Sequence, residues 1–132
     1  MRWHEIGFQS NHNHTFMIAP AESMEWMQQE LPELSCELHP EQGMFPNMQV
    51  FSRYACSKAL IGDFQKIGQC FTLAETLYRN GSNTVRTAIE NVFVFSISRI
   101  MSITDSNRNQ IKALMPPTLL ALYMNQVLHH GY

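Results

Sequence analysis

The chain has 132 residues, of which 45% are hydrophobic and 15% charged, and its formal net charge is −2. This length suits one domain, residues 1–132, and the composition excludes a disordered or fibrous protein. No apolar run approaches the roughly 20 residues that span a bilayer, and the start, MRWHEIGFQS, lacks a signal-peptide hydrophobic region, so we expect a cytoplasmic protein without membrane contact.

The first third of the chain predicts an irregular lead-in, one helix and a long loop. After about fifteen residues without clear periodicity, a helix should run from Pro20 to about Glu30, because proline favours the first helical turn and Pro32 disfavours helical geometry at Leu31. The stretch from Pro32 to Asn47 is long for a loop in a compact domain. It is therefore a candidate binding loop.

Residues 48–132 predict a helical core. Asn47 has the chemistry to cap a second helix, which should end at Gly62, and Asp63 to cap a third. Asn80-Gly81 predicts a left-handed stop for that third helix. Because Ser82 or Asn83 starts the next helix almost at once, the third and fourth helices should form an antiparallel hairpin.

The segment from Ser82 to Met101 should be the helix around which the others pack. Its apolar residues follow α-helical spacing, and the run Val92 to Phe95 is apolar on every side. The spaced residues are Val85, Ala88, Ile89, Val92, Phe95 and Ile100.

A short helix should follow with Ile111, Leu114 and Met115 as its apolar residues. A last helix should start near Pro117 or Thr118 and bury Leu120, Tyr123, Met124, Val127 and Leu128. The sequence therefore predicts an all-α domain of about five to six helices, packed as antiparallel hairpins around a central helix near residues 83–101.

Charge is distributed unevenly along the chain. Residues 1–47 carry seven acidic side chains and one basic side chain, a net charge of −6, whereas residues 48–132 carry eight basic and four acidic side chains, a net charge of +4. Two interpretations have equal weight: a charged partner for the acidic segment, or docking of that segment on the basic helices. The basic residues are scattered, which argues against direct nucleic-acid binding.

Residues with catalytic or metal-binding chemistry are sparse. His12 and His14 would point the same way in an extended segment and hold a metal if His4 or His39 joined them, but surface histidines are the simpler interpretation. We expect no cofactor and no catalytic residue. Glu75 and Glu90 lie on the predicted hairpin, and ion pairs of Glu75 with Arg79 and of Glu90 with Arg86 explain them more simply than an acid/base pair.

The sulfur-containing residues predict packing rather than chemistry. Three cysteines, Cys36, Cys56 and Cys70, are expected to be reduced, the last two in core-facing positions. Five of the nine methionines surround the acidic third, where they form either an adaptable contact surface or, more simply, part of the core. These five are Met17, Met24, Met27, Met44 and Met48.

The later helices carry a family resemblance. The run FTLAETLYRNGSNTVRTAIENVFVFSISRIM, Phe71 to Met101, followed by ALMPPTLLALYMNQVLHHG, Ala113 to Gly131, resembles small helical bacterial immunity proteins of contact-dependent growth inhibition and related polymorphic toxin systems. The matching features are Ala74-Glu75, Leu77-Tyr78, the Gly81 turn, Ala88-Ile89-Glu90-Asn91 and the pattern from Leu114 to Pro116. The resemblance implies a protein that binds and neutralises a cognate toxin domain and is not an enzyme.

The charge distribution is compatible with that implication. Toxins of these systems include ribonucleases and other nucleases with basic substrate-binding surfaces, which an acidic segment can cover as a phosphate mimic. The expected toxin contacts are Glu22, Glu25, Glu30, Glu33, Glu37 and Glu41, with Trp26, Met44 or Phe45 as apolar anchors. The alternatives are a helical scaffold or adaptor, including a homo-oligomer, and a metal-dependent enzyme that uses the N-terminal histidines.

Overall fold

The computed structural model describes residues 17–104 and 106–130, and over these ranges the chain is helical, with one isolated β-bridge between Ile18 and Gly81. The described helices share one hydrophobic core, so the predicted all-α fold is confirmed. None of these helices is long and apolar enough to cross a membrane. The expected irregular lead-in falls mostly on residues 1–16, outside the described ranges.

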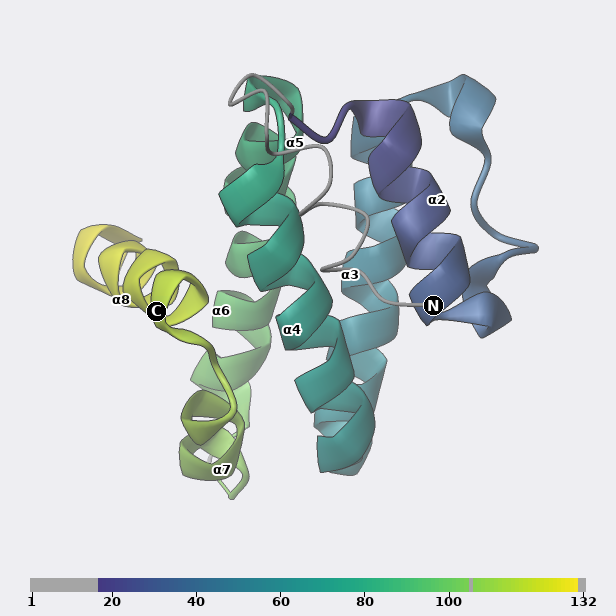
Figure 1. Cartoon of the computed structure of the whole chain (residues 1–132). Helices are drawn as coiled ribbons and strands as arrows, with labels where there is room; N and C mark the ends of the chain where they lie inside the picture. Colours follow the sequence, from purple (N-terminus) through teal and green to yellow (C-terminus); the bar gives the residue numbers. More distant parts are fainter. Residues whose placement is uncertain (1–16, 105, 131–132) are drawn as a thin grey trace.

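In Figure 1, α3 runs downwards, α4 upwards and the segment α5–η4–α6 downwards again. Helix α2 lies beside α3, and α8 lies across the outer side of α4 and α6. Between α2 and α3 lie two short 3₁₀ helices, η2 and η3, and η4 is a π-helical segment between α5 and α6. The elements in chain order are α2 (Pro20–Glu30), η2 (Pro32–Leu34), η3 (Pro40–Gln42), α3 (Met44–Ile61), α4 (Phe64–Asn80), α5 (Asn83–Ala88), η4 (Ile89–Val94), α6 (Phe95–Ile103), α7 (Arg108–Ala113) and α8 (Pro117–His130).

Several predicted helix ends are confirmed. The predicted helix from Pro20 to Glu30 has those bounds, and Pro117 begins α8. Gly62 ends α3 in the left-handed region at φ 74°, and the Asp63 carboxylate accepts a hydrogen bond from the Lys66 amide at 3.2 Å. The predicted cap at Asn47 is wrong, because α3 begins three residues earlier and Asn47 is buried in its first turn.

Gly81 ends α4 for a different reason from the one predicted. Its backbone is extended, with φ −84° and ψ 158°, so no left-handed stop exists here. The Ile18 amide donates to the Asn80 carbonyl at 2.7 Å, and the Ser82 amide donates to the Ile18 carbonyl at 2.9 Å. A Cβ atom on residue 81 would lie 2.3 Å from the Leu77 carbonyl oxygen. Glycine is therefore required for space at the α4–α5 turn.

The central helical segment contains a change of period that the sequence pattern does not reveal. Its buried residues come in neighbouring pairs, and the step from Ala88-Ile89 to Phe93-Val94 is five residues, whereas the next step, to Ile97-Ser98, is four. The π-helical turn η4, with i to i+5 hydrogen bonding, takes up the additional residue. As a result Phe93 occupies the core, and the predicted core residues Val92, Phe95 and Ile100 are half-buried.

Aromatic packing joins this segment to its neighbours. The Phe93 ring stacks on that of Phe51 from α3, with centroids 4.8 Å apart, and meets the edge of the Phe71 ring from α4 at 6.2 Å. All three side chains are fully buried. The predicted antiparallel hairpin of α4 with the following helix thus packs against α3 around one aromatic cluster.

The last helix is fastened by a buried carboxylate. Glu75 on α4 accepts hydrogen bonds from the Thr118 amide at 3.2 Å and the Leu119 amide at 2.8 Å, in the first turn of α8. The predicted ion pair with Arg79 is therefore wrong. The pair between Glu90 and Arg86 is wrong as well, because Glu90 accepts from the Tyr78 hydroxyl at 2.6 Å. Arg86 lies over the Tyr78 ring, 4.7 Å from its centroid.

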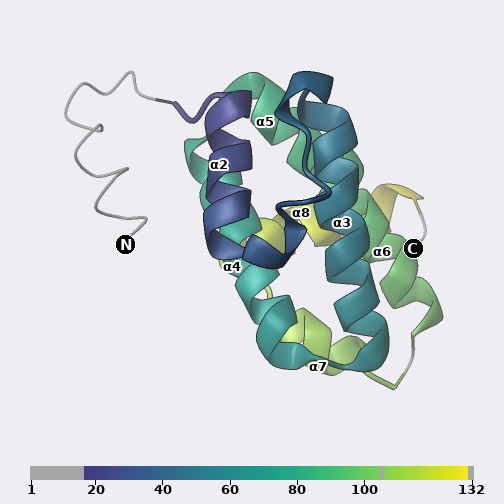
Figure 2. The same cartoon turned by 90° about the vertical axis from the view of Figure 1, so that its right-hand side faces the viewer.

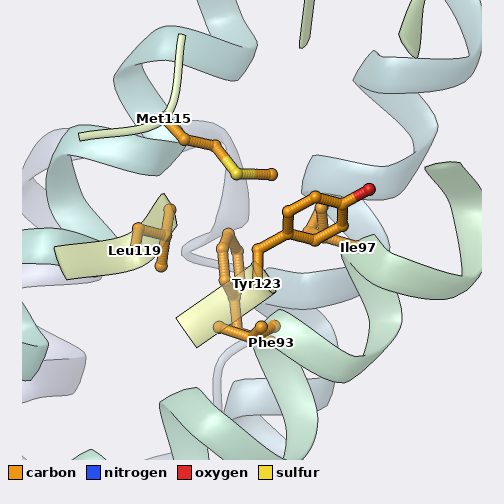
Figure 3. A pocket seen from close by; sticks show the side chains of 6 residues that line it. Phe93, Ile97, Met115, Leu119 and Tyr123 are labelled. Carbon is orange, nitrogen blue, oxygen red and sulfur yellow. The ribbon is translucent and has the colours of Figure 1, made fainter. Parts of the chain in front are cut away.

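The apolar side of α8 closes the core. Figure 3 shows Leu119 and Tyr123 of α8 meeting Phe93, Ile97 and Met115, around a packing gap with no space for a water molecule. The expected apolar face is partly wrong, because Leu128 and Met124 are exposed, whereas Leu119 is buried in their place. The helix packs against α4, η4 and α6, and Gln126 near its end donates to the Glu90 carbonyl at 3.1 Å.

We predict that Phe93→Ala lowers the free energy of unfolding by about 3 to 5 kcal/mol, because it opens a cavity between two other phenyl rings. Urea unfolding followed by circular dichroism measures the change. Val92→Ala is the matched control on the same turn and should cost clearly less, because Val92 is half-buried. Equal losses for the two variants would contradict the register set by η4.

Two glycine substitutions should have opposite effects. Gly81→Ala forces a backbone shift and should cost about 1 to 3 kcal/mol, as overpacking does. Gly68→Ala, inside α4 with nothing within 4 Å of the added Cβ, should stabilise by about 0.5 to 1 kcal/mol. Thermal unfolding of both variants tests the contrast, and a neutral Gly81→Ala would refute the close approach of the Leu77 carbonyl and the Val85 side chain to residue 81.

Candidate protein interaction surface

The predicted contact residues come from α2, the connection from α2 to α3, and the start of α3, which together form one side of the molecule. Figure 2 looks onto this side and shows the connection lying in front of the space between the two helices. We call the exposed residues Glu25, Glu37, Glu41 and Phe45 the acidic face.

The connection is an ordered scaffold. Asn47 holds it from α3: its Oδ1 accepts from the His39 amide at 2.7 Å, and its Nδ2 donates to the carbonyls of His39 at 2.8 Å and Gly43 at 2.6 Å. Leu34 and Leu38 are buried beneath it. Hydrogen bonds and buried leucines therefore both hold the predicted binding loop in place, so its exposed side chains have defined positions.

The six predicted glutamates differ in what they do. Glu22 accepts from the Ala19 amide at 3.1 Å and so caps the start of α2. Glu30 is half-buried, and its carbonyl accepts from Gln69 Nε2 at 2.6 Å. Glu25, Glu37 and Glu41 are exposed, with Glu41 3.8 Å from His39 Nδ1. The side chains of these last three residues face solvent.

Glu33 is engaged within the protein. Its carboxylate accepts a hydrogen bond from the Tyr54 hydroxyl and lies 3.2 Å from Lys66 Nζ. The Tyr54 hydrogen bond is the main cause that lowers the pKa of Glu33, with Lys66 adding a smaller contribution. Burial, followed by the contact with Glu33, raises the pKa of Tyr54. For this one acid, docking on the basic helices is the interpretation that the contacts support.

Two of the three predicted apolar anchors are wrong. Trp26 is 6% exposed and Met44 is 4% exposed, because both side chains belong to the core, where the Ser23 hydroxyl donates to the Met44 sulfur at 3.3 Å. Met24, Met27 and Met48 are buried too, which leaves Met17 as the exposed methionine of this group. Phe45 is 42% exposed and remains a candidate anchor.

A shallow depression beside Phe45 was not predicted. Asn83, Thr84 and Thr87 of α5 line it together with Phe45, and its volume is about 240 Å³. The sequence offered a weak signal, since these polar residues alternate with the buried Val85 and Ala88. Nothing in the sequence placed them next to a residue forty positions earlier.

The described residues offer no metal centre, since no group of three or more His, Cys, Asp or Glu side chains converges within ranges 17–104 and 106–130. His4, His12 and His14 lie outside those ranges. The expected reduced thiols are confirmed: Cys36, Cys56 and Cys70 are free, and burial raises the pKa of Cys56 to about 11 and that of Cys70 to about 12.

We predict that Tyr54→Phe raises the pKa of Glu33 toward the ordinary glutamate value of about 4.3, and by more than Lys66→Gln does. Because the pKa is lowered in the folded state, the contribution of Glu33 to stability is present above that ordinary value. It is lost as the pH falls through the lowered pKa. Carboxyl-detected NMR titration measures both variants, and an equal or larger effect of Lys66→Gln would contradict the dominant role of Tyr54.

Comparison with known proteins gives a family and no named relative. No curated protein and no solved structure matches the chain. Residues 24–130 match a family described as a domain of unknown function, DUF7674. The matched range begins inside α2 and ends at the last residue of α8, so it includes the core and the acidic face. The chain belongs to the DUF7674 family.

Proposed function

We propose that this protein is an immunity protein that binds a cognate toxin domain through the acidic face and thereby neutralises it. The observation that carries the proposal is the exposure of Glu25, Glu37, Glu41 and Phe45 on α2, the connection and the start of α3, where Asn47 holds the connection in place. A preorganised surface of this kind loses little conformational entropy on binding. The resemblance of residues 71–101 and 113–131 to immunity proteins supports the same conclusion.

The proposed mechanism is occlusion. A nuclease domain needs a basic surface to bind its substrate, and exposed carboxylates compete with the substrate phosphates for that surface. Long-range attraction between the acidic face and the basic toxin raises the association rate, while Phe45 supplies an apolar contact that slows dissociation. The immunity protein needs no catalytic residue, cofactor or metal for this task, and it acts in the cytoplasm, where the toxin would meet its substrate.

Coexpression with the toxin-like domain encoded by the neighbouring open reading frame tests the function directly. The protein should copurify with that domain and restore growth to cells that produce it. A neighbouring product that neither binds the protein nor is neutralised by it would refute the proposal.

We predict that Glu25→Gln, Glu37→Gln and Glu41→Gln together lower the association rate with the toxin about tenfold or more at low salt, with a smaller effect on dissociation. The loss should shrink as salt screens the charges. Surface plasmon resonance at several salt concentrations measures both rates.

The matched control adds the same three units of positive charge elsewhere, by Gln65→Lys, Asn109→Lys and Gln110→Lys, at exposed positions on α4 and α7. This control should keep most of the wild-type association rate. If both triple variants lose the same amount, net charge rather than the acidic face governs association.

A second candidate function is a self-associating helical scaffold. Ile61 is 71% exposed and Ile103 is 73% exposed, at the ends of the parallel helices α3 and α6, and Leu60 is exposed beside Ile61. Leu60 and Ile61 are adjacent exposed aliphatic residues, and a cluster of such residues can mark a contact surface. Multi-angle light scattering separates the two functions: a stable oligomer that Ile61→Glu dissolves supports the scaffold, and a monomer supports a protein that binds another partner.

A further inference from the structure

A second recognition feature lies away from the acidic face. The end of α6, the face of α7 and the middle of α8 enclose a cleft of about 350 Å³. In Figure 1 these helices lie on the left, whereas the α2–α3 connection lies on the right. The volume falls in the range of small-molecule sites. The cleft is lined by Met101, Ser102, Arg108, Lys112, Tyr123, Met124 and Val127.

Positive charge is concentrated at one wall of this cleft. Arg108 and Lys112 are four residues apart on α7, so they share one face of that helix. The Arg108 guanidinium is oriented by its Nε, which donates to the Met101 carbonyl at 2.8 Å. Among the described residues that line the cleft, none is acidic.

The side-chain polar groups of Lys112 and Tyr123 form no ion pair or hydrogen bond with another described residue. Lys112 is half-buried, and no carboxylate in residues 17–104 or 106–130 pairs with it, in contrast to Lys66 with its partner Glu33. An ammonium group without a carboxylate partner can pair with an anion that enters the cleft. The buried Tyr123 ring carries its hydroxyl on the side turned away from Leu119, as Figure 3 shows. That hydroxyl forms no hydrogen bond with another described residue, so it can donate to a ligand.

The rest of the lining is apolar. Met101 is buried at the base, and Met124 and Val127 of α8 form the opposite wall. Thioether side chains adapt to apolar groups of different shape. The cleft therefore offers a cationic end and an apolar end at the same time.

We propose that this cleft binds a small amphiphilic anion, a phosphate or carboxylate group carried on one aromatic ring or short alkyl chain. The anionic group lies against Lys112, with Arg108 contributing charge and the Tyr123 hydroxyl donating a hydrogen bond. The apolar body lies against Met101, Met124 and Val127. This site is independent of the acidic face and of the toxin-binding function.

NMR titration of the full chain with phenyl phosphate and with benzoate tests the proposal, and the two probes distinguish the phosphate from the carboxylate as the preferred group. The amides of residues 101–102, 108–112 and 123–127 should shift in a saturable manner with at least one of them. Benzyl alcohol, which lacks the charge, and inorganic phosphate, which lacks the ring, should each bind at least about tenfold more weakly. Equal binding of inorganic phosphate would overturn the role of the apolar wall.

Substitutions locate the site. Lys112→Gln should weaken binding of the preferred probe about tenfold, and Tyr123→Phe, which keeps the buried ring, roughly threefold. Arg79→Gln removes one exposed positive charge from α4 and should change the dissociation constant by less than about twofold. Each variant should keep the wild-type circular dichroism spectrum. Absence of saturable shifts, or equal losses in Lys112→Gln and Arg79→Gln, would overturn the proposal.

Discussion

The π-helical turn between α5 and α6 is the constraint on which the core depends. In a regular α-helix, residues spaced by four advance about 40° per step, so Val85, Ile89, Phe93, Ile97 and Met101 would drift by about 160° around the axis. The wider turn at Ile89–Val94 offsets part of that drift and keeps these five side chains directed into the core. Phe93 then reaches both Phe51 and Phe71, and α8 has a surface to pack on.

Local chemistry explains which parts of this fold the sequence predicted. Pro20, Gly62, Asp63 and Pro117 act through their own backbone or through the next turn, so their signals survive in any tertiary context, and the helices they delimit are confirmed. Part of the predicted core of the central helix was wrong, because an α-helical period was applied to a segment that contains a π turn. Gly81 ends α4 as predicted but for another reason, since its backbone is extended and the Leu77 carbonyl oxygen and Val85 side chain leave no room for a Cβ atom. The backbone pairing of Ile18 with this turn comes from a distant part of the chain.

The candidate surface shows the same division between local and distant effects. Sequence alone identified an acidic segment, but it treated all six glutamates alike as charge contacts and all three apolar residues alike as candidate anchors. Packing separates them: Trp26 and Met44 are drawn into the core, Glu22 caps a helix and Glu33 is held by Tyr54, which leaves Glu25, Glu37, Glu41 and Phe45 exposed. Asn47 was read as a helix cap, yet its amide bonds to His39 and Gly43 fix the whole connection.

Charge asymmetry along the chain becomes an asymmetry in space. The contact of Glu33 with Lys66 neutralises one acid of the first third against the basic part, but the exposed acids lie on the α2–α3 side, while Arg108 and Lys112 line the cleft on the α7–α8 side. A molecule polarised in this way orients a charged partner before contact, because the field acts over roughly a Debye length, about 8 to 10 Å at physiological salt. Under the two proposals, a basic partner would be directed to the acidic face and a small anion to the cleft, so the proposed sites would not compete.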